Sequence, residues 1–418
     1  MANRIFVLLT LVLVVLALDF YIYKAILGAR TNWSEAKRKR FSISWWTVTI
    51  LFLIGIFFSI YFNIRLTIRA IILVAFFLSF IGKVFFALFL LVDDVRRLTI
   101  WVKRKVIQTK SSIIVGEPIK RSDFLLKAGI VAAALPISSL SFGIISGAYD
   151  YKIVRQKLYL ANLPKAFDGM TLGQISDIHS GSFYDRKAVL GGVEMLMKEK
   201  PDLVFFTGDM VNNIASEMRE YQDIFSKIKA PLGVYSVLGN HDYGDYFFGR
   251  GPSAAKAKSL SDLKQTHKNM GWNLLLNEHR SIKIGGEEIG ILGIENWGAG
   301  RFAKYGRMDL TVQNTDHFPV KLLLSHDPSH WRAQVLESYP QIDAMFSGHT
   351  HGMQFGVRTK EFQWSPIEYI YKEWAGLYHE KNQQLYVNVG YGFLGYPGRV
   401  GILPEITIFE LKSGQAPA

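Results

Sequence analysis

The first third of the chain consists of long apolar runs, whereas the rest alternates short apolar runs with polar stretches. Three runs, residues 5–23, 44–62 and 70–92, approach or exceed the roughly 20 residues that are needed to cross a hydrocarbon core. A fourth run, residues 124–147, is rich in Ala, Gly and Ser, and is typical of either a weaker span or a signal-like segment. We therefore predict a membrane region over residues 1–148 with three to four transmembrane helices.

From about Leu163 the pattern changes to short β-rich runs that alternate with helix-like amphipathic stretches, which predicts an α/β layered domain. We assign this domain to residues 149–418. The apolar spacing of residues 185–199 and 217–228 predicts surface helices. The predicted strands cover residues 170–176, 203–207, 234–238, 321–325 and 344–347.

Each predicted strand is followed at once by residues that commonly bind metal ions. These residues are Asp177 and His179, then Asp209, then Asn240, His241 and Asp242, then His326, and finally His349 and His351. The carboxyl ends of neighbouring strands meet at one crevice in open α/β sheets, so we expect these side chains to converge. A glycine directly before Asp209, Asn240 and His349 allows a sharp turn and leaves space beside the site.

The residue types indicate which metal the site prefers. Asp, His and Asn ligands without sulfur suit Mn, Fe or Zn better than Mg or Ca. The chain has no cysteine, which excludes thiolate sites and cysteine nucleophiles. Five of the ten histidines fall in the strand-end motifs, and we interpret the others as structural: His267, His279, His317, His330 and His379.

The ordered set D-x-H, G-D, G-N-H-D, a single His and G-H-T-H resembles the signature of the calcineurin-like metallophosphoesterases, especially their membrane-tethered branch. The resemblance implies a four-layer α/β/β/α sandwich. It also implies that Asp177, His179 and His351 hold one divalent metal ion, that Asn240, His326 and His349 hold a second, and that Asp209 bridges both. His241 would contact the phosphate or protonate the leaving group, with Asp242 orienting it.

Such a pair of cations lowers the pKa of a bridging water and holds the phosphoryl oxygens for in-line attack. The resemblance therefore implies metal-dependent hydrolysis of a phosphodiester, a pyrophosphate or a phosphomonoester. Arg399 is our candidate for contact with the substrate phosphate, because similar proteins place a basic residue near this position; Arg301 is a second candidate. The aromatic stretches 243–250 and 362–374 are expected to hold a lipid substrate, to rest on the bilayer, or to pack as a lid.

The net charge of +13 is concentrated in the membrane half. Residues 1–150 hold 19 Lys and Arg against 7 Asp and Glu, and the remainder holds 29 against 28. The second half thus lacks the basic surface of a nucleic-acid-binding domain, and no nucleic-acid partner is expected. The basic loops 24–40 and 96–121 should lie in the cytoplasm, which places the second half outside it if all four runs span.

We accordingly expect a multi-pass cell-membrane protein with an extracytoplasmic phosphoesterase domain and a lipid-linked or envelope substrate. A first alternative is an enzyme of lipid A synthesis similar to UDP-2,3-diacylglucosamine pyrophosphatase, although that substrate is cytoplasmic. A second alternative is a membrane sensor or transporter with a phosphate-binding domain, supported by the intramembrane charges Asp19 and Lys83. The simpler interpretation is that Asp19 lies near a helix end and that Lys83 extends to the membrane surface. The oligomeric state is left open.

Overall fold

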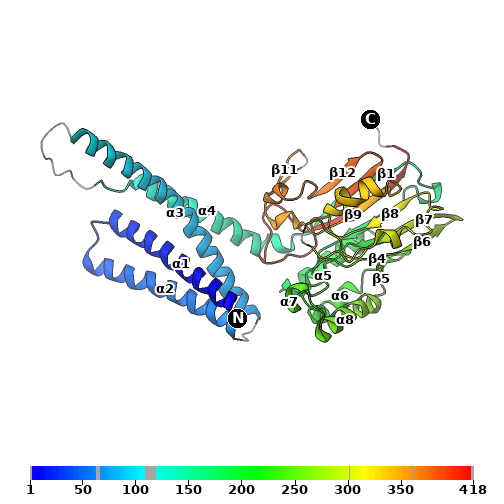
Figure 1. Cartoon of the computed structure of the whole chain (residues 1–418), viewed down its shortest axis with the longest axis horizontal. Coiled ribbons are helices and arrows are strands. Elements are labelled where there is room, and N and C mark those ends of the chain that lie inside the picture. The colour runs from blue at the N-terminus through cyan, green and yellow to red at the C-terminus, as the bar shows by residue number, and fades with distance from the viewer. Residues whose placement is uncertain (1, 63–65, 109–118, 301, 360, 416–418) are drawn as a thin grey trace. The chain divides into compact units, whose positions relative to one another are not determined.

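The computed structural model describes residues 2–62, 66–108, 119–300, 302–359 and 361–415, so Arg301 lies outside the described residues. The chain divides into two compact units, residues 1–142 and 143–418 (Figure 1). The predicted limit of the membrane region at residue 148 stays a prediction.

The first unit is helical. Among the described residues it forms α1 (Ala2–Ala29), α2 (Glu35–Tyr61), α3 (Leu66–Gln108) and α4 (Asp123–Ile145), of which α4 continues into the second unit. All four helices are long and apolar enough to cross a membrane, and they contain the four predicted apolar runs. Helix α4 is continuous through Pro136, which membrane helices tolerate better than soluble ones do. Membrane association is thereby confirmed, while the side on which each loop lies stays a prediction.

The two intramembrane charges form an ion pair with each other. Lys83 Nζ lies 2.7 Å from Asp19 Oδ1, and the Thr49 hydroxyl donates to Asp19 Oδ2 at 2.9 Å. Asp19 is fully buried, and Lys83 also lies over the ring of Trp45. The expected helix-end position of Asp19 and surface extension of Lys83 are therefore wrong. The pair explains both charges as packing within the helical unit, because each charge neutralises the other.

The second unit contains two six-stranded sheets in the part of the chain that the structure describes. The first sheet has the order β1 (Lys152–Leu160), β14 (Glu405–Ser413), β2 (Thr171–Ile175), β3 (Leu203–Phe206), β4 (Val234–Ser236) and β5 (Asn273–Leu274). The second has the order β12 (Gly376–Glu380), β13 (Gln383–Val387), β9 (Ala344–Ser347), β8 (Lys321–Leu324), β7 (Glu287–Gly293) and β6 (Glu278–Ile284). A separate hairpin pairs β10 (Val357–Arg358) with β11 (Gln363–Trp364).

Both faces of each sheet are covered, as the continuous apolar character of the strands requires. In β3, Leu203 and Phe205 face a core shared with the second sheet, whereas Val204 and Phe206 face a core shared with helices. In β8, Leu322 likewise faces the shared core and Leu323 faces a separate outer core. The result is the expected four-layer α/β/β/α sandwich, so the predicted fold class is confirmed (Figure 1).

The helices of the second unit follow the sequence pattern only in part. Helix α5 (Arg186–Lys198) begins after Asp185, whose side chain accepts the Ala188 N–H, as predicted. The predicted helix over residues 217–228 is wrong: the 3-10 turn Ala215–Glu220 and the short α6 (Gln222–Phe225) replace it. The reason is that the Glu217 carboxylate accepts N–H groups of the preceding loop and fixes a tighter turn. The remaining helical segments are α6 (Gln222–Phe225), α7 (Asp245–Phe248), α8 (Ala254–Met270), α9 (Met308–Thr311) and α10 (Leu336–Ser338).

Strand direction explains where the site lies. Strands β2, β3 and β4 are parallel in the first sheet, and β8 and β9 are parallel in the second. Their carboxyl ends therefore lead into loops at one edge of each sheet. A hydrogen bond from the His349 backbone N–H to the Asp177 carboxylate, at 3.0 Å, joins a loop of one sheet to a loop of the other. The motifs that the sequence places at five strand ends thus come together between the two sheets.

Candidate metal centre

Five of the converging residues have a left-handed backbone. The φ angle is 51° at Asp177, 48° at His179, 58° at Asp209, 74° at His349 and 51° at His351. A residue with a side chain adopts this conformation at a cost of order 1–3 kcal/mol, and such strain gathers at functional sites. The surrounding contacts hold the strained loops and aim the side chains inward from the strand ends.

Two of the predicted glycines are required by close approach. A Cβ atom at Gly348 would collide with the carboxylate of Asp177, and a Cβ atom at Gly239 would collide with that of Asp209. Each glycine therefore lets one loop lie directly against a carboxylate that comes from another loop. This is the space beside the site that the sequence pattern predicts.

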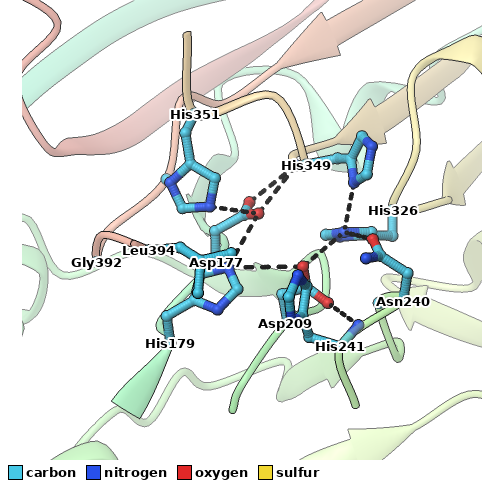
Figure 2. A network of polar contacts seen from close by, with 12 residues as sticks. Asp177, His179, Asp209, Asn240, His241, His326, His349, His351, Gly392 and Leu394 are labelled. Carbon is cyan, nitrogen blue, oxygen red and sulfur yellow. Dashed lines mark hydrogen bonds and ion pairs between the residues drawn. The ribbon is translucent and has the colours of Figure 1, made fainter. Parts of the chain in front are cut away.

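The first cluster consists of Asp177, His179 and His351, all buried (Figure 2). His351 Nε2 lies 3.2 Å from Asp177 Oδ1, and His179 Nε2 lies 4.0 Å from the same oxygen. His179 Nε2 is also 3.6 Å from Asp209 Oδ2, and it is buried with no hydrogen-bond partner. A buried ring nitrogen without a partner is costly unless it binds a ligand that the polypeptide itself does not supply.

The second cluster surrounds His326, which is fully buried. Its Nε2 atom lies 3.1 Å from Asp209 Oδ2, 3.2 Å from Asn240 Oδ1 and 3.3 Å from His349 Nδ1. The contact between His326 and His349 brings two ring nitrogens together, and the oxygens that complete the cluster accept hydrogen bonds but do not donate them (Figure 2). A set of lone pairs that point at one another is stable when a cation lies among them.

The other ring nitrogens have partners that fix the orientation of these histidines. His326 Nδ1 lies 2.8 Å from the Thr207 carbonyl oxygen and donates to it, which leaves the Nε2 lone pair free. His349 Nε2 lies 2.8 Å from the Tyr371 hydroxyl, which leaves Nδ1 for the cluster. His179 Nδ1 lies 3.2 Å from Asn212 Oδ1. Such contacts to the second nitrogen are a regular feature of metal-binding histidines.

The electrostatics of the site favour positive charge. Burial lowers the pKa of His179 to about 3, so that ring is neutral and can use its lone pair. Burial opposes the charging of His326 as well, but the neighbouring Asp209 prevails and raises the pKa to about 10, so a metal ion at Nε2 would displace a proton from that nitrogen. The pKa of Asp209 is held well below its ordinary range, because the surrounding histidines outweigh the effect of burial. Burial opposes the ionisation of Asp177 too, but His351 outweighs it and lowers the pKa, so both carboxylates stay ionised and attract a cation.

These residues fit a pair of divalent cations. The groups that converge are two carboxylates, one amide oxygen and four imidazoles, and they lie in the two sets that the resemblance implies. Nitrogen and oxygen donors without sulfur suit Mn, Fe or Zn. Asp209 contributes to the second cluster and also faces His179 of the first, as a bridging ligand would.

His241 lies at the edge of the site, while Asp242 has a role that differs from the predicted one. The His241 backbone N–H donates to Asp209 Oδ1, and its ring Nδ1 lies 2.7 Å from the Asn212 carbonyl oxygen. That carbonyl, and not Asp242, orients the ring. The buried Asp242 carboxylate instead accepts four backbone N–H groups, those of Asp209, Met210, Val211 and Gly239. We correct its role to that of a brace for the Asp209 loop.

Arg399 lies behind the first cluster and is 1% exposed. Its guanidinium donates to the carbonyl oxygens of Gly392, Val389 and Ile402. Burial lowers its pKa to about 10. Nη2 is also 3.2 Å from His351 Nδ1, although the carbonyls of Val389 and Gly392 suffice for both hydrogens of Nη2. The geometry therefore favours a role for Arg399 in positioning the His351 side of the site. It does not favour the predicted contact between Arg399 and the substrate phosphate.

Sequence reasoning missed several residues that support the site. Asn212 contacts His179 with its side chain and His241 with its carbonyl oxygen, yet it belongs to none of the predicted motifs. Tyr371 contacts His349 from the aromatic stretch 362–374, for which a contact with a proposed metal ligand was not among the expected roles. Asp327 lies 3.6 Å from His349 Nε2, and its position directly after His326 is the one signal that could have indicated this role.

A cavity of about 170 Å³ adjoins the second cluster through Asn240. Aromatic rings and polar groups line it together: Asn240, Tyr246, Arg250, Asn296, Phe302 and Tyr305. The Tyr305 ring stacks on Tyr243 with 3.9 Å between the ring centroids, which fixes one wall. The volume is below the 300–1,000 Å³ typical of pockets for drug-sized ligands, so the cavity accommodates a ring or a small head group.

Comparison with known proteins agrees with this geometry. Residues 170–353 match the family described as calcineurin-like phosphoesterase. Residues 3–148 match the family described as probable calcineurin-like phosphoesterase, transmembrane domain. The solved structure of phosphopantetheinyl hydrolase from Mycobacterium tuberculosis matches with a TM-score of 0.27 and 15% identity, over 48% of this chain and 89% of that one. This likeness is too distant to transfer any activity.

Two relatives are similar in sequence. The transmembrane protein with metallophosphoesterase domain of Danio rerio is 29% identical over 293 residues, which cover 68% of this chain and 61% of the relative. The uncharacterized metallophosphoesterase YkuE of Bacillus subtilis is 29% identical over 256 residues, which cover 60% of this chain and 82% of the relative. The two family models together cover the apolar helices and the strand-end residues, so the chain carries a calcineurin-like metallophosphoesterase domain that is preceded by the transmembrane region of such proteins.

Proposed function

We propose that the protein is a membrane-anchored, metal-dependent phosphoesterase. The observation that carries this proposal is the convergence of lone pairs on His326 Nε2 from Asp209, Asn240 and His349, within 3.1–3.3 Å. Groups so arranged would hold one divalent cation, and Asp177, His179 and His351 would hold a second. When bound, the cations would supply Lewis-acid charge for the phosphoryl oxygens and acidify a water molecule.

The remaining steps belong to residues of the chain itself. In hydrolysis, a water oxygen forms a bond to phosphorus, and the bond from phosphorus to the leaving oxygen breaks. His241 is the proposed proton donor to that oxygen. Its Nδ1 proton is engaged by the Asn212 carbonyl, so Nε2 is the atom that gives the proton. Proton donation of this kind contributes typically about 10² to 10⁴ in rate.

The cavity beside Asn240 is the proposed site for the leaving group. Tyr246 lies over the His241 ring with 4.5 Å between centroids, and its hydroxyl accepts a hydrogen bond from Asn240 at 3.0 Å. One aromatic residue thus links the proposed acid, a proposed metal ligand and the cavity. The size of the cavity suits the head group of a phosphodiester or pyrophosphate. A phosphomonoester with a small leaving group fits as well.

The proposed location follows from the charge of the loops. The basic segments 24–40 and 96–121 are assigned to the cytoplasm, which places the catalytic unit outside it when α4 spans the membrane. A lipid-linked or envelope phosphoester is then the natural substrate class. A UDP-2,3-diacylglucosamine pyrophosphatase-like activity requires the opposite side, so the location of the domain distinguishes the two.

The test uses the full chain in detergent, stripped of metal and then reloaded with Mn²⁺. Hydrolysis of bis-p-nitrophenyl phosphate is compared with that of p-nitrophenyl phosphate to rank diester against monoester. We expect turnover that requires Mn²⁺ and that is lost in Asp209→Asn, which keeps the shape of the side chain but removes its charge. The control is Asp223→Asn, because Asp223 is exposed and pairs only with Arg186 in the described contacts.

Three results are informative. Turnover that survives in Asp209→Asn would contradict the assignment of Asp209. Turnover without any metal would contradict the proposed chemistry. Failure of the metal-loaded chain to hydrolyse either compound, while Mn²⁺ raises the Tm of the chain but not that of Asp209→Asn, would favour a domain that binds a phosphorylated signal without cleaving it.

A further inference from the structure

A loop of the catalytic unit exposes an unusual number of large apolar side chains. This apolar loop, residues 353–370, contains the β10–β11 hairpin and the 3-10 turn Pro366–Tyr369. Val357 pairs with Trp364 in the hairpin, and Trp364 Nε1 donates to the Tyr369 hydroxyl, so these side chains are neighbours. Exposed fractions range from 39% to 77% for Met353, Phe355, Val357, Phe362, Tyr369 and Ile370. Contiguous exposed apolar surface of this kind marks an interaction site.

Both ends of the apolar loop are fixed at the metal centre. Its first residue, Met353, is two positions after His351 and shares a 3-10 turn with it. Directly after its last residue comes Tyr371, whose hydroxyl contacts His349 Nε2 at 2.8 Å. The two ends of the loop therefore lie beside proposed ligands of both clusters, at His351 and, through Tyr371, at His349.

The apolar loop is also bound to the end of the fourth apolar helix. Phe355 forms a parallel bridge with Val400, and the Val400 carbonyl accepts the Gly356 N–H at 2.9 Å. The neighbouring Arg399 N–H donates to the Gly143 carbonyl oxygen at 3.1 Å. Gly143 lies in the last turn of α4, inside the segment Asp123–Tyr149 that is long and apolar enough to span a membrane. Two successive main-chain contacts, at Val400 and at Arg399, thus connect the loop to the last turn of that helix.

We propose that the apolar loop inserts into the surface of the bilayer that holds α4, and that the metal centre acts on phosphoesters presented by that bilayer. The position of the helix end favours lipid over a protein partner. If α4 spans the membrane, the residues that are hydrogen-bonded to Gly143 lie at the membrane surface. Tyr369 and Trp364 are aromatic residues with a polar atom, which suit the region between head groups and acyl chains. This inference rests on the proposed function for its catalytic part only.

Insertion explains the substrate class in physical terms. An amphiphilic substrate keeps its acyl chains in the bilayer, so its phosphate stays near the head-group plane. If the apolar loop is anchored in this plane, the metal centre lies close to the phosphate, and no free energy is needed to extract the lipid from the bilayer. The cavity of about 170 Å³ then needs to hold only the head group.

The first experiment measures insertion without any catalysis. The chain has no cysteine, so a single cysteine introduced by Phe362→Cys or Ile370→Cys carries an environment-sensitive NBD label at one place. The full chain is placed in nanodiscs with or without lipids that bear a doxyl quencher. The control label is at Lys283→Cys, an exposed side chain beside the β6–β7 turn. That turn precedes β7 and therefore lies at the opposite end of the sheet from the metal centre.

We expect doxyl lipids to remove most of the NBD emission at positions 362 and 370 and to leave the control label bright. Equal, weak quenching at all three positions would overturn insertion. Strong quenching at position 283 alone would overturn it as well, because the opposite end of the unit would then face the bilayer.

The second experiment tests the substrate class. The double variant Phe362→Ser/Ile370→Ser is compared with the unmodified chain on a p-nitrophenyl ester of phosphatidic acid held in the nanodisc and on soluble bis-p-nitrophenyl phosphate. We expect a loss of about tenfold or more for the bilayer ester and no change for the soluble one, because both side chains are exposed and neither is a proposed ligand. An equal rate on the bilayer ester would overturn the assignment. Inactivity of the unmodified chain on both esters would refute the proposed function, while the label experiment would still decide insertion.

Discussion

The carboxylate of Asp242 offers a sharp test of how the metal centre is held. Its Oδ1 accepts the N–H groups of Met210 at 2.8 Å and Val211 at 3.2 Å, and its Oδ2 accepts those of Asp209 at 3.0 Å and Gly239 at 2.9 Å. In Asp242→Asn one oxygen becomes an NH₂ group, so two buried N–H donors lose their acceptor. A buried N–H group that loses its acceptor costs about 1–3 kcal/mol, so the loss amounts to about 2–6 kcal/mol.

This loss falls on the loop that carries the proposed bridging ligand. We therefore expect Asp242→Asn to lower the free energy of unfolding and, in addition, to weaken Mn²⁺ binding as measured by calorimetry. The control is Asp202→Asn, in which a carboxylate that accepts the Thr171 N–H and hydroxyl at the opposite end of the strands is changed in the same way. Both donors reach the same oxygen, which Asn keeps, so that variant should lose less stability than Asp242→Asn and keep its affinity for Mn²⁺. Unchanged stability and Mn²⁺ affinity in Asp242→Asn would refute the bracing role.

Three further predictions concern other parts of the molecule. His241→Gln should lower kcat by about 10² to 10⁴ for an alkyl leaving group and far less for p-nitrophenol, which leaves without a proton, with Mn²⁺ affinity unchanged in calorimetry. Lys83→Met should lower the Tm in detergent, because an unpaired buried Asp19 costs about 3–5 kcal/mol, and adding Asp19→Leu should restore it. Burial lowers the pKa of His267 to about 3. Below pH 6.5 the unfolded chain therefore binds the proton more readily than the folded chain, and the free energy of unfolding decreases as the pH is lowered. Urea unfolding should show a loss of about 2 kcal/mol at pH 5 relative to pH 7 that His267→Gln removes.

Much of the fold could be predicted because its signals are local. Uninterrupted apolar runs are long enough to span a membrane in α1 to α4, and β3, β8 and β9 are short apolar runs that end at a polar motif. The predicted helix over residues 217–228 failed because a side chain accepts the main-chain N–H groups that lie just before it. Glu217 uses its carboxylate to accept N–H groups of the Asn212 loop, and apolar spacing cannot reveal this competition. The pairing of Asp19 with Lys83 likewise depends on how two separate helices pack.

The proposed metal ligands could be predicted because each lies directly after a strand, where topology decides its position. Arg399 was harder, because a loop with Pro397 and two glycines suggests an exposed cation. The structure folds this loop inward, and main-chain carbonyl oxygens surround the guanidinium. Asn212 and Tyr371 carry no motif, and only their distance to a histidine in space reveals them. Sequence order thus indicates the ligands, whereas their supports require coordinates.

The pairing of β1 with β14 has a consequence for how the catalytic unit forms. Nine residues of β1, from Lys152 to Leu160, lie in register beside Glu405 to Ser413, in parallel, and β14 in turn lies between β1 and β2. The strand that follows the membrane helix therefore has no neighbour in the sheet until the ribosome has synthesised about 250 further residues. Closing so long a loop is slow. Until β14 has been synthesised, β1 is an open strand edge that can pair with another chain. Chaperones that cover such edges should therefore determine the yield of folded protein.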